Sequence, residues 1–233
     1  MVTVIGNRHD YTSSDVQAAL HNPLTGARGL ESYIQYFVRQ EIPANTFYGQ
    51  LDSGKYVPLY PVGVIASVSG SAITLDSAGN ATLFDITDDD ANETWVDNAY
   101  VCFLDASTGK LECTADNDTT KVKVSSVSSA VVTNNGALTG FGGSSDPAAN
   151  DLFVPGNWDD STTINDIVFV TETVRLPENG TTSGDLVTLT GYREGEIDYD
   201  KLPGHSQSFV DVVLDNSSST LNTFISRFRV VNR

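Results

Sequence analysis

The sequence predicts a mainly β protein with a barrel- or sandwich-like antiparallel core, preceded by one or two short N-terminal helices. Its apolar set is rich in Val, Tyr and Phe, which stand beside many Thr and 19 Gly residues, a mixture that favours strands and tight turns. A Leu-Asp pair followed by small residues and Gly recurs three times between β-prone runs. Asp and Ser side chains can seed such a turn, and Gly accepts the positive φ of a hairpin tip. The three turns are Leu51-Asp52-Ser53-Gly54, Leu75-Asp76-Ser77-Ala78-Gly79 and Leu104-Asp105-Ala106-Ser107-Thr108-Gly109.

The chain carries 30 Asp and Glu residues against 13 Lys and Arg residues, a formal net charge of −17. Such a surface repels nucleic-acid phosphates and anionic membranes, so we expect neither as a partner. The Asp excess has two interpretations: Asp is a common turn residue, or the protein works in concentrated salt or beside divalent cations. No apolar run approaches the ~20 residues that span a bilayer, and the N-terminus lacks a secretory signal. We therefore expect a soluble protein.

Residues 1–45 are expected to form an N-terminal arm with helices. Ser14-Asp15-Val16-Gln17 has the form of a capping box, and Asn22-Pro23 ends the helix that it would start. A stronger helix is predicted from about Gly29 to Gln40, because apolar residues recur there at steps of three and four. These residues are Leu30, Tyr33, Ile34, Phe37 and Val38. The helix either docks on a partner or packs on the protein's own sheet.

A β core domain is expected over residues 46–135. Its first strands are predicted near 46–51, 55–60, 62–68, 71–76 and 80–86. Pro58 and Pro61 cannot donate ladder hydrogen bonds, so the second strand either lies at a sheet edge or breaks there. Gly63 indicates a bulge or a close backbone approach in the third strand. The core then continues through a hairpin that joins residues 95–104 to residues 110–114, and through the Val-rich run 122–132.

The only two cysteines, Cys102 and Cys113, fall on that hairpin. Pairing Asp105 with Lys110 across a four-residue loop brings the two cysteines opposite one another. Directly opposed positions on antiparallel strands can supply the Cβ separation of a disulfide, about 4 Å. Two reduced, buried cysteines are the alternative, which we favour because nothing in the sequence indicates export.

Residues 136–150 are rich in Gly, with two adjacent Ser residues, and predict a flexible loop or linker. It is either a domain boundary or a long loop within one domain. A second β region follows over 151–233, with β-prone runs at 166–175, 186–192, 208–214 and 221–231. The last run carries Arg227 and Arg229, and it is either a terminal strand that pairs with a neighbour or an ordinary sheet strand.

No catalytic or metal signature appears in the sequence. The three histidines, His9, His21 and His205, are far apart, and no nucleophile elbow or phosphate-binding loop is present. Asp88-x-Asp90-x-Asn92 matches the first half of a calcium loop, but Glu93 stands where that loop needs Gly. We therefore expect a non-enzymatic protein without a cofactor, and a solvated acidic loop around Asp88, Asp90 and Asn92.

The segment from Gly49 to Lys55, followed by Val62-Gly63-Val64-Ile65-Ala66, resembles the β-tulip core of head decoration (cement) proteins of tailed phages. The resemblance covers roughly residues 45–86. It implies a virion protein, synthesised in the host cytoplasm, that sits on the outside of the capsid and fastens coat subunits. The implied partners are the major capsid protein and further copies of the chain, in trimers or other oligomers. This chain is longer than that pattern, which leaves open a cement protein, a head-fibre base or a tail component.

Partner contacts are expected outside the β core. The candidate residues are Leu30, Tyr33, Ile34 and Phe37 of the predicted helix, and Arg227 and Arg229 of the last run. The alternative function is a β module that binds glycan or a host surface, as an adhesin or tail component. It would use loops around Trp95, Trp158 and Tyr192.

Overall fold

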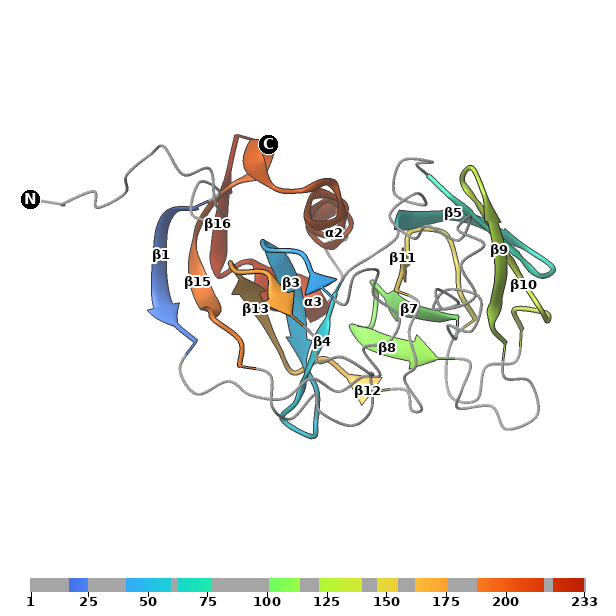
Figure 1. The fold of residues 1–233 in the computed structure, drawn as a ribbon, viewed down its shortest axis with the longest axis horizontal. Coiled ribbons are helices and arrows are strands. Elements are labelled where there is room, and N and C mark those ends of the chain that lie inside the picture. Colours follow the sequence, from blue (N-terminus) through green and yellow to red (C-terminus); the bar gives the residue numbers. More distant parts are fainter. Residues whose placement is uncertain are drawn as a thin grey trace, which may run out of the picture.

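A computed structural model describes residues 17–24, 41–59, 63–76, 101–113, 122–139, 146–154, 162–175, 188–215 and 220–232. Over these residues the protein is mainly β (Figure 1). Two curled sheets, each a half-barrel, carry nearly all the strands, and two short helices lie near the C-terminus. Strand pairs in the described part of the chain are antiparallel except for one parallel pair.

The smaller of the two curled sheets has six strands in the order β1-β15-β13-β3-β4, with β16 also paired to β15. These strands are β1 (Gln17–Pro23), β3 (Thr46–Gln50), β4 (Tyr56–Pro58), β13 (Asp166–Val170), β15 (Gly191–Asp198) and β16 (Phe228–Val231). A separate two-stranded ladder joins β2 (Glu41–Ile42) to β14 (Val174–Arg175).

The larger sheet has eight strands in the order β12-β8-β7-β11-β5-β6-β10-β9. These are β5 (Gly63–Ser69), β6 (Ala72–Leu75), β7 (Cys102–Asp105), β8 (Lys110–Cys113), β9 (Val124–Ser128), β10 (Val131–Asn134), β11 (Leu152–Phe153) and β12 (Thr162–Thr163). Strands from before and after residues 136–150 are interleaved in both sheets, because β11 lies between β5 and β7 and β13 lies between β3 and β15.

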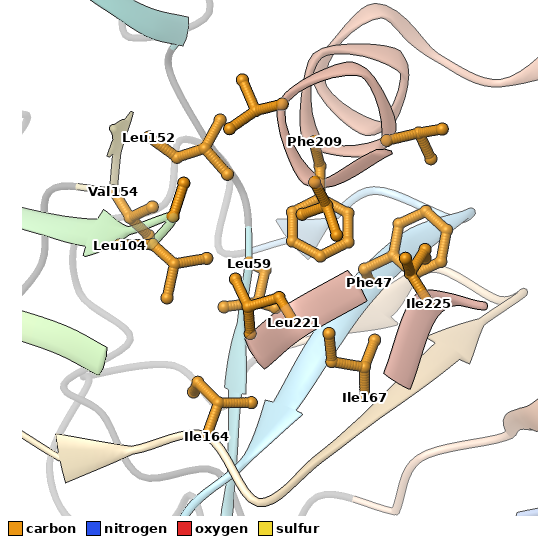
Figure 2. Close-up of a cluster of buried hydrophobic side chains, with 14 of the residues drawn as sticks. Phe47, Leu59, Leu104, Leu152, Val154, Ile164, Ile167, Phe209, Leu221 and Ile225 are labelled. Atoms are coloured by element: carbon orange, nitrogen blue, oxygen red, sulfur yellow. The ribbon is translucent and has the colours of Figure 1, made fainter. Parts of the chain in front are cut away.

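One apolar cluster joins the two sheets to the helices α2 (Gly204–Asp215) and α3 (Thr220–Ile225) (Figure 2). Phe47 on β3 belongs to this cluster, and its ring centroid lies 4.9 Å from those of Phe169 and Phe209. The larger sheet contributes Leu104 and Leu152 to the same cluster. Burying a large apolar side chain stabilises a fold by about 1.5–3 kcal/mol, so the shared cluster ties the sheets together.

The predicted hairpins of the core are confirmed where the chain is described. Leu51–Gly54 turns β3 into β4, with Gly54 at φ 80°, and β4 with its Pro58 lies at a sheet edge. The register of β5 shifts between Ile65 and Ser67, a bulge two residues after Gly63. Of the second turn only Leu75 and Asp76 are described, and the strand predicted at 80–86 lies outside the described residues.

The third turn also forms as its sequence predicts. Asp105 pairs with Lys110 across the turn, and Gly109 has φ 75°. The Asp105 carboxylate accepts hydrogen bonds from the Ser107 amide at 2.8 Å and from the Thr108 amide at 3.1 Å. Burial raises the pKa of Asp105, but the bonds from Ser107 and Thr108 outweigh it and leave that pKa below its ordinary value.

The N-terminal helix predicted from Ser14 is wrong over the residues that can be compared. Residues Gln17–Pro23 form β1, which pairs with β15 from Gln17 opposite Ile197 to Pro23 opposite Tyr192. A helix this short is marginal by itself, and the open edge of β15 offers its backbone a full set of partners. The stronger predicted helix from Gly29 to Gln40 lies outside the described residues.

Of the strands predicted in the C-terminal region, one is wrong and one is confirmed only at its end. The run 208–214 belongs to α2, and the run 221–231 splits into α3 and the short strand β16. The Val-rich sequence favours a strand locally, but Phe209, Val210 and Val213 recur at helical steps and are all buried in the shared cluster. Burial at a helical period therefore overrides β-propensity here.

Candidate interaction surface

No metal-binding cluster occurs in the part of the chain that the structure describes. There, no three His, Cys, Asp or Glu side chains gather so as to hold a metal ion. His21 lies on β1 and His205 on α2, in different elements. No helix within the described ranges is long and apolar enough to cross a membrane.

Acidic residues are missing from two long segments of this acidic chain. Residues 53–75 and 119–145 contain no Asp or Glu, although the whole sequence has 30 of them. These segments supply the neighbouring strands β5, β6, β10 and β9 of the larger sheet. Apart from β4 at the edge of the smaller sheet, the strands of these two segments therefore lie side by side in one half of the larger sheet.

The strand register lines up the outward side chains of these four strands in two rows. The first row is Ser67, Thr74, Val131 and Ser128, and the second is Ser69, Ala72, Thr133 and Ser126. We call these eight residues the neutral face. Five of them are exposed, and Ala72, Thr74 and Val131 are half-buried. No member carries a charge.

The opposite side of the same strands is buried in the core, and this determines which of their residues point outward. Val68, Ile73, Val132 and Val127 pair across the strands and form an apolar row, and all four belong to one core cluster. Successive side chains of a strand point to opposite faces, so the neutral face must lie outside. A shift of one residue in register would bury its hydroxyls and expose four apolar side chains.

The neutral face suits contact with another protein. Its hydroxyl groups both donate and accept hydrogen bonds, and covering it removes no ion from water. The cores of protein–protein interfaces are depleted of charged residues in the same way. Elsewhere the net charge of −17 opposes close approach of another acidic surface.

Arg227, a predicted partner contact, is an exposed residue whose side chain is held by contacts within the molecule. Arg227 and Arg193 both form ion pairs with the carboxylate of Asp166, one to each oxygen. Arg227 also donates to the Ile167 carbonyl at 3.1 Å. Arg193 donates in addition to the Tyr56 hydroxyl at 3.3 Å. The cluster fixes the start of β13 against β15 and the turn before β16.

Arg229 is the more accessible of the two predicted arginines. It lies opposite Glu196 in the β15–β16 pair and forms an ion pair with it at 3.0 Å. Its side chain is 78% exposed. An exposed pair of this kind contributes about 0–1 kcal/mol, so a partner carboxylate can replace Glu196 at little cost.

Two buried titratable groups hold elements together. His205 of α2 lies with Nε2 3.0 Å from the Thr46 hydroxyl of β3, and burial lowers its pKa to about 3. Burial raises the pKa of Asp151 to about 6, with the charges of Asp105 and Glu112 acting in the same direction. Asp151 accepts hydrogen bonds from the Ala148 amide at 2.9 Å and the Ala106 amide at 3.3 Å, which ties the segment before β11 to the hairpin turn.

Of the remaining predicted site residues, some lie in described strands and the others lie outside the described residues. Tyr192 lies on β15, half-buried between Pro23 and Phe169 in the strand register. Cys102 and Cys113 are directly opposed, and Cys102 is a free, buried cysteine. Outside the described residues lie the calcium candidates Asp88, Asp90 and Asn92, the helix residues Leu30, Tyr33, Ile34 and Phe37, and Trp95 and Trp158.

Comparison with known proteins gives no relative: no protein-family model, no curated protein and no solved structure matches the chain. The neutral face is also a feature that the sequence reasoning missed. The signal was present in the two acid-free segments, but their meeting in one sheet depends on the β6–β10 pairing, which joins residues about 60 apart in sequence.

Proposed function

We propose that this chain is a non-enzymatic virion structural protein that decorates or stabilises the outside of a tailed-virus capsid by binding coat subunits. The observation that carries the proposal is the neutral face on an otherwise strongly acidic molecule. Charge is segregated away from a surface of small hydroxyl and apolar side chains, as at a site of protein contact. The rest of the molecular surface is negatively charged, and its electrostatic repulsion keeps decorated particles away from one another and from nucleic acid.

The finer assignment to a β-tulip fold is part of this proposal. It is supported by the β3–β4 hairpin around Leu51–Gly54, and by β5, which carries the Gly63-Val64-Ile65 sequence that gave the family resemblance. Cement protein, head-fibre base and tail component remain the three positions in the virion that this fold can serve. The first accounts best for a broad uncharged contact surface.

The test is the composition of particles. Tailed-virus particles are purified on a density gradient from a culture in which the chain is expressed. Quantitative mass spectrometry then measures the protein composition of these particles. We expect the chain at a fixed ratio to the major coat protein, with extra density on the capsid surface in micrographs. A chain that is absent from purified particles, or present only in traces that vary between preparations, contradicts the proposal. A fixed but low copy number with density confined to the tail moves the assignment to a tail component.

A further inference from the structure

The two cysteines lie at the open end of the hairpin formed by β7 and β8, away from its turn. Cys102 is the first residue of β7, Cys113 is the last residue of β8, and the register places them directly opposite one another. Cys102 is fully buried and free. Two opposed residues of an antiparallel pair are either a hydrogen-bonded or a non-hydrogen-bonded pair, and only the latter brings the side chains close.

The hydrogen bonds of Cys102 decide which kind of pair this is. Its carbonyl accepts from the Val154 amide at 2.9 Å, and Val154 directly follows β11, the neighbour of β7 on the side away from β8. The N–H and C=O of one strand residue point to the same side, and consecutive residues alternate. Asp105, three residues on, accordingly points its carbonyl toward the β8 side, where it accepts from Gly109.

Cys102 and Cys113 are therefore a non-hydrogen-bonded pair, for which the Cα atoms lie about 4.5 Å apart. That separation falls within the Cα range of natural disulfides, about 4.4–6.8 Å. We infer that this pair is an oxidation site, at which a small-molecule disulfide converts the two thiols into a cross-strand disulfide. The inference is independent of the proposed function, because it concerns the chemistry of the purified chain.

The reaction is two thiol–disulfide exchanges. One cysteine thiolate, having lost its proton to solvent, attacks a sulfur of the oxidant and expels one thiolate, which leaves a mixed disulfide on the protein. The second cysteine thiolate attacks the protein sulfur of that bond and expels the other half of the oxidant. The protein is oxidised by two electrons, and the oxidant is reduced to two thiols. Because Cys102 is buried, exchange in the folded chain waits for the hairpin to open.

A bond at this position locks a hairpin that contributes to the core shared by the two sheets. Leu104 of β7 and Leu111 of β8 both reach the apolar cluster that the two sheets share. Closing the loop between residues 102 and 113 restricts the unfolded chain, and in a protein of this size it should raise Tm by about 5–10 °C.

The experiment uses the purified full chain in oxidised and reduced glutathione, both folded and during refolding from denaturant. After unfolding, free thiols are alkylated and counted by intact mass, and Tm is measured for each species. We expect oxidised monomer that takes up no alkylating reagent, formed quickly on refolding and slowly from the folded state. Its Tm should exceed that of the reduced chain and return to it on reduction.

The matched variants are Cys113→Ser and Cys102→Ala/Cys113→Ala. In the single variant the reaction should stop at the mixed disulfide of Cys102 with glutathione. In the double variant the oxidant should not change Tm. Oxidation that gives only glutathione adducts or covalent dimers of the wild-type chain overturns the inference. So does a wild-type chain that keeps both thiols alkylatable after refolding in oxidised glutathione.

Discussion

His205 is neutral in the folded protein because it is buried between α2 and β3, where its Nε2 lies 3.0 Å from the Thr46 hydroxyl. In the unfolded chain its pKa is about 6.5, against about 3 in the fold. The unfolded state therefore takes up a proton first as the pH falls. The stability that His205 contributes is complete above about pH 6.5 and is lost progressively between pH 6.5 and 3, by up to about 4–5 kcal/mol.

Asp151 acts in the opposite direction. Its folded-state pKa of about 6 lies above the ordinary value of 3.8, so the folded state holds the proton more tightly. The contribution of Asp151 is complete below about pH 4 and is lost as the pH rises from 4 to 6. The two groups offset each other between pH 4 and 6, so the wild-type pH profile does not isolate either one.

His205→Gln separates the two effects, since it removes the titrating group and leaves Asp151 unchanged. We expect the stability difference between wild type and variant to shrink by about 3 kcal/mol between pH 7 and pH 4. Urea unfolding at several pH values measures it. Parallel pH profiles for the two proteins would mean that His205 titrates normally in the fold.

Among the secondary-structure elements, β13 and β15 approach closely at Gly191, where the chain enters β15. A Cβ atom there would lie 2.9 Å from the Val170 Cα and would also collide with the Phe169 carbonyl oxygen. Both atoms are backbone, so they can move only if the strand pair separates.

Gly191→Ala should therefore destabilise the protein by more than about 3 kcal/mol, as expected for overpacking against the backbone. Gly54→Ala is the matched control, because nothing lies within 4 Å of a Cβ there and only the positive φ of 80° opposes it. The control should cost about 1 kcal/mol. Equal midpoints for the two variants in urea unfolding would show that the strands separate easily.

Some secondary-structure elements could be predicted from the sequence and others could not. The β3–β4 and β7–β8 hairpins could be predicted because Asp, Ser and Gly at their turns act locally, as the bonds to the Asp105 carboxylate show. The segment 17–23 and the run 208–214 could not, because distant partners decide their structure: β15 for the first and the shared apolar cluster for the second. The neutral face escaped prediction for the same reason.

On the scale of the whole molecule, charge distribution and fold agree. Acid-free sequence forms β5, β6, β9 and β10, whose outer side is the neutral face. Three arginines of the described C-terminal region are instead paired with acids: Arg193 and Arg227 with Asp166, and Arg229 with Glu196. The proposed contact with coat protein thus belongs to the larger sheet, and the partner-contact residues predicted in the last strand contribute to the smaller one.

Charged substitutions on the neutral face test this account most directly. Thr74 and Val131 are neighbours at the centre of its first row, so Thr74→Asp/Val131→Asp places two buried charges in any contact made there. Thr223→Asp/Thr220→Asp adds the same charge at exposed positions of α3, a helix that contributes no residue to the neutral face or to the core cluster beneath it. Both variants are first checked for cooperative unfolding near the wild-type Tm.

The measurement is the amount of each purified protein that cosediments with tailed-virus particles lacking the chain. We expect the α3 variant to bind like the wild type and the neutral-face variant to lose at least about tenfold in affinity, as for a disrupted interface core. Binding of the neutral-face variant at wild-type strength, with the fold intact, would contradict the account.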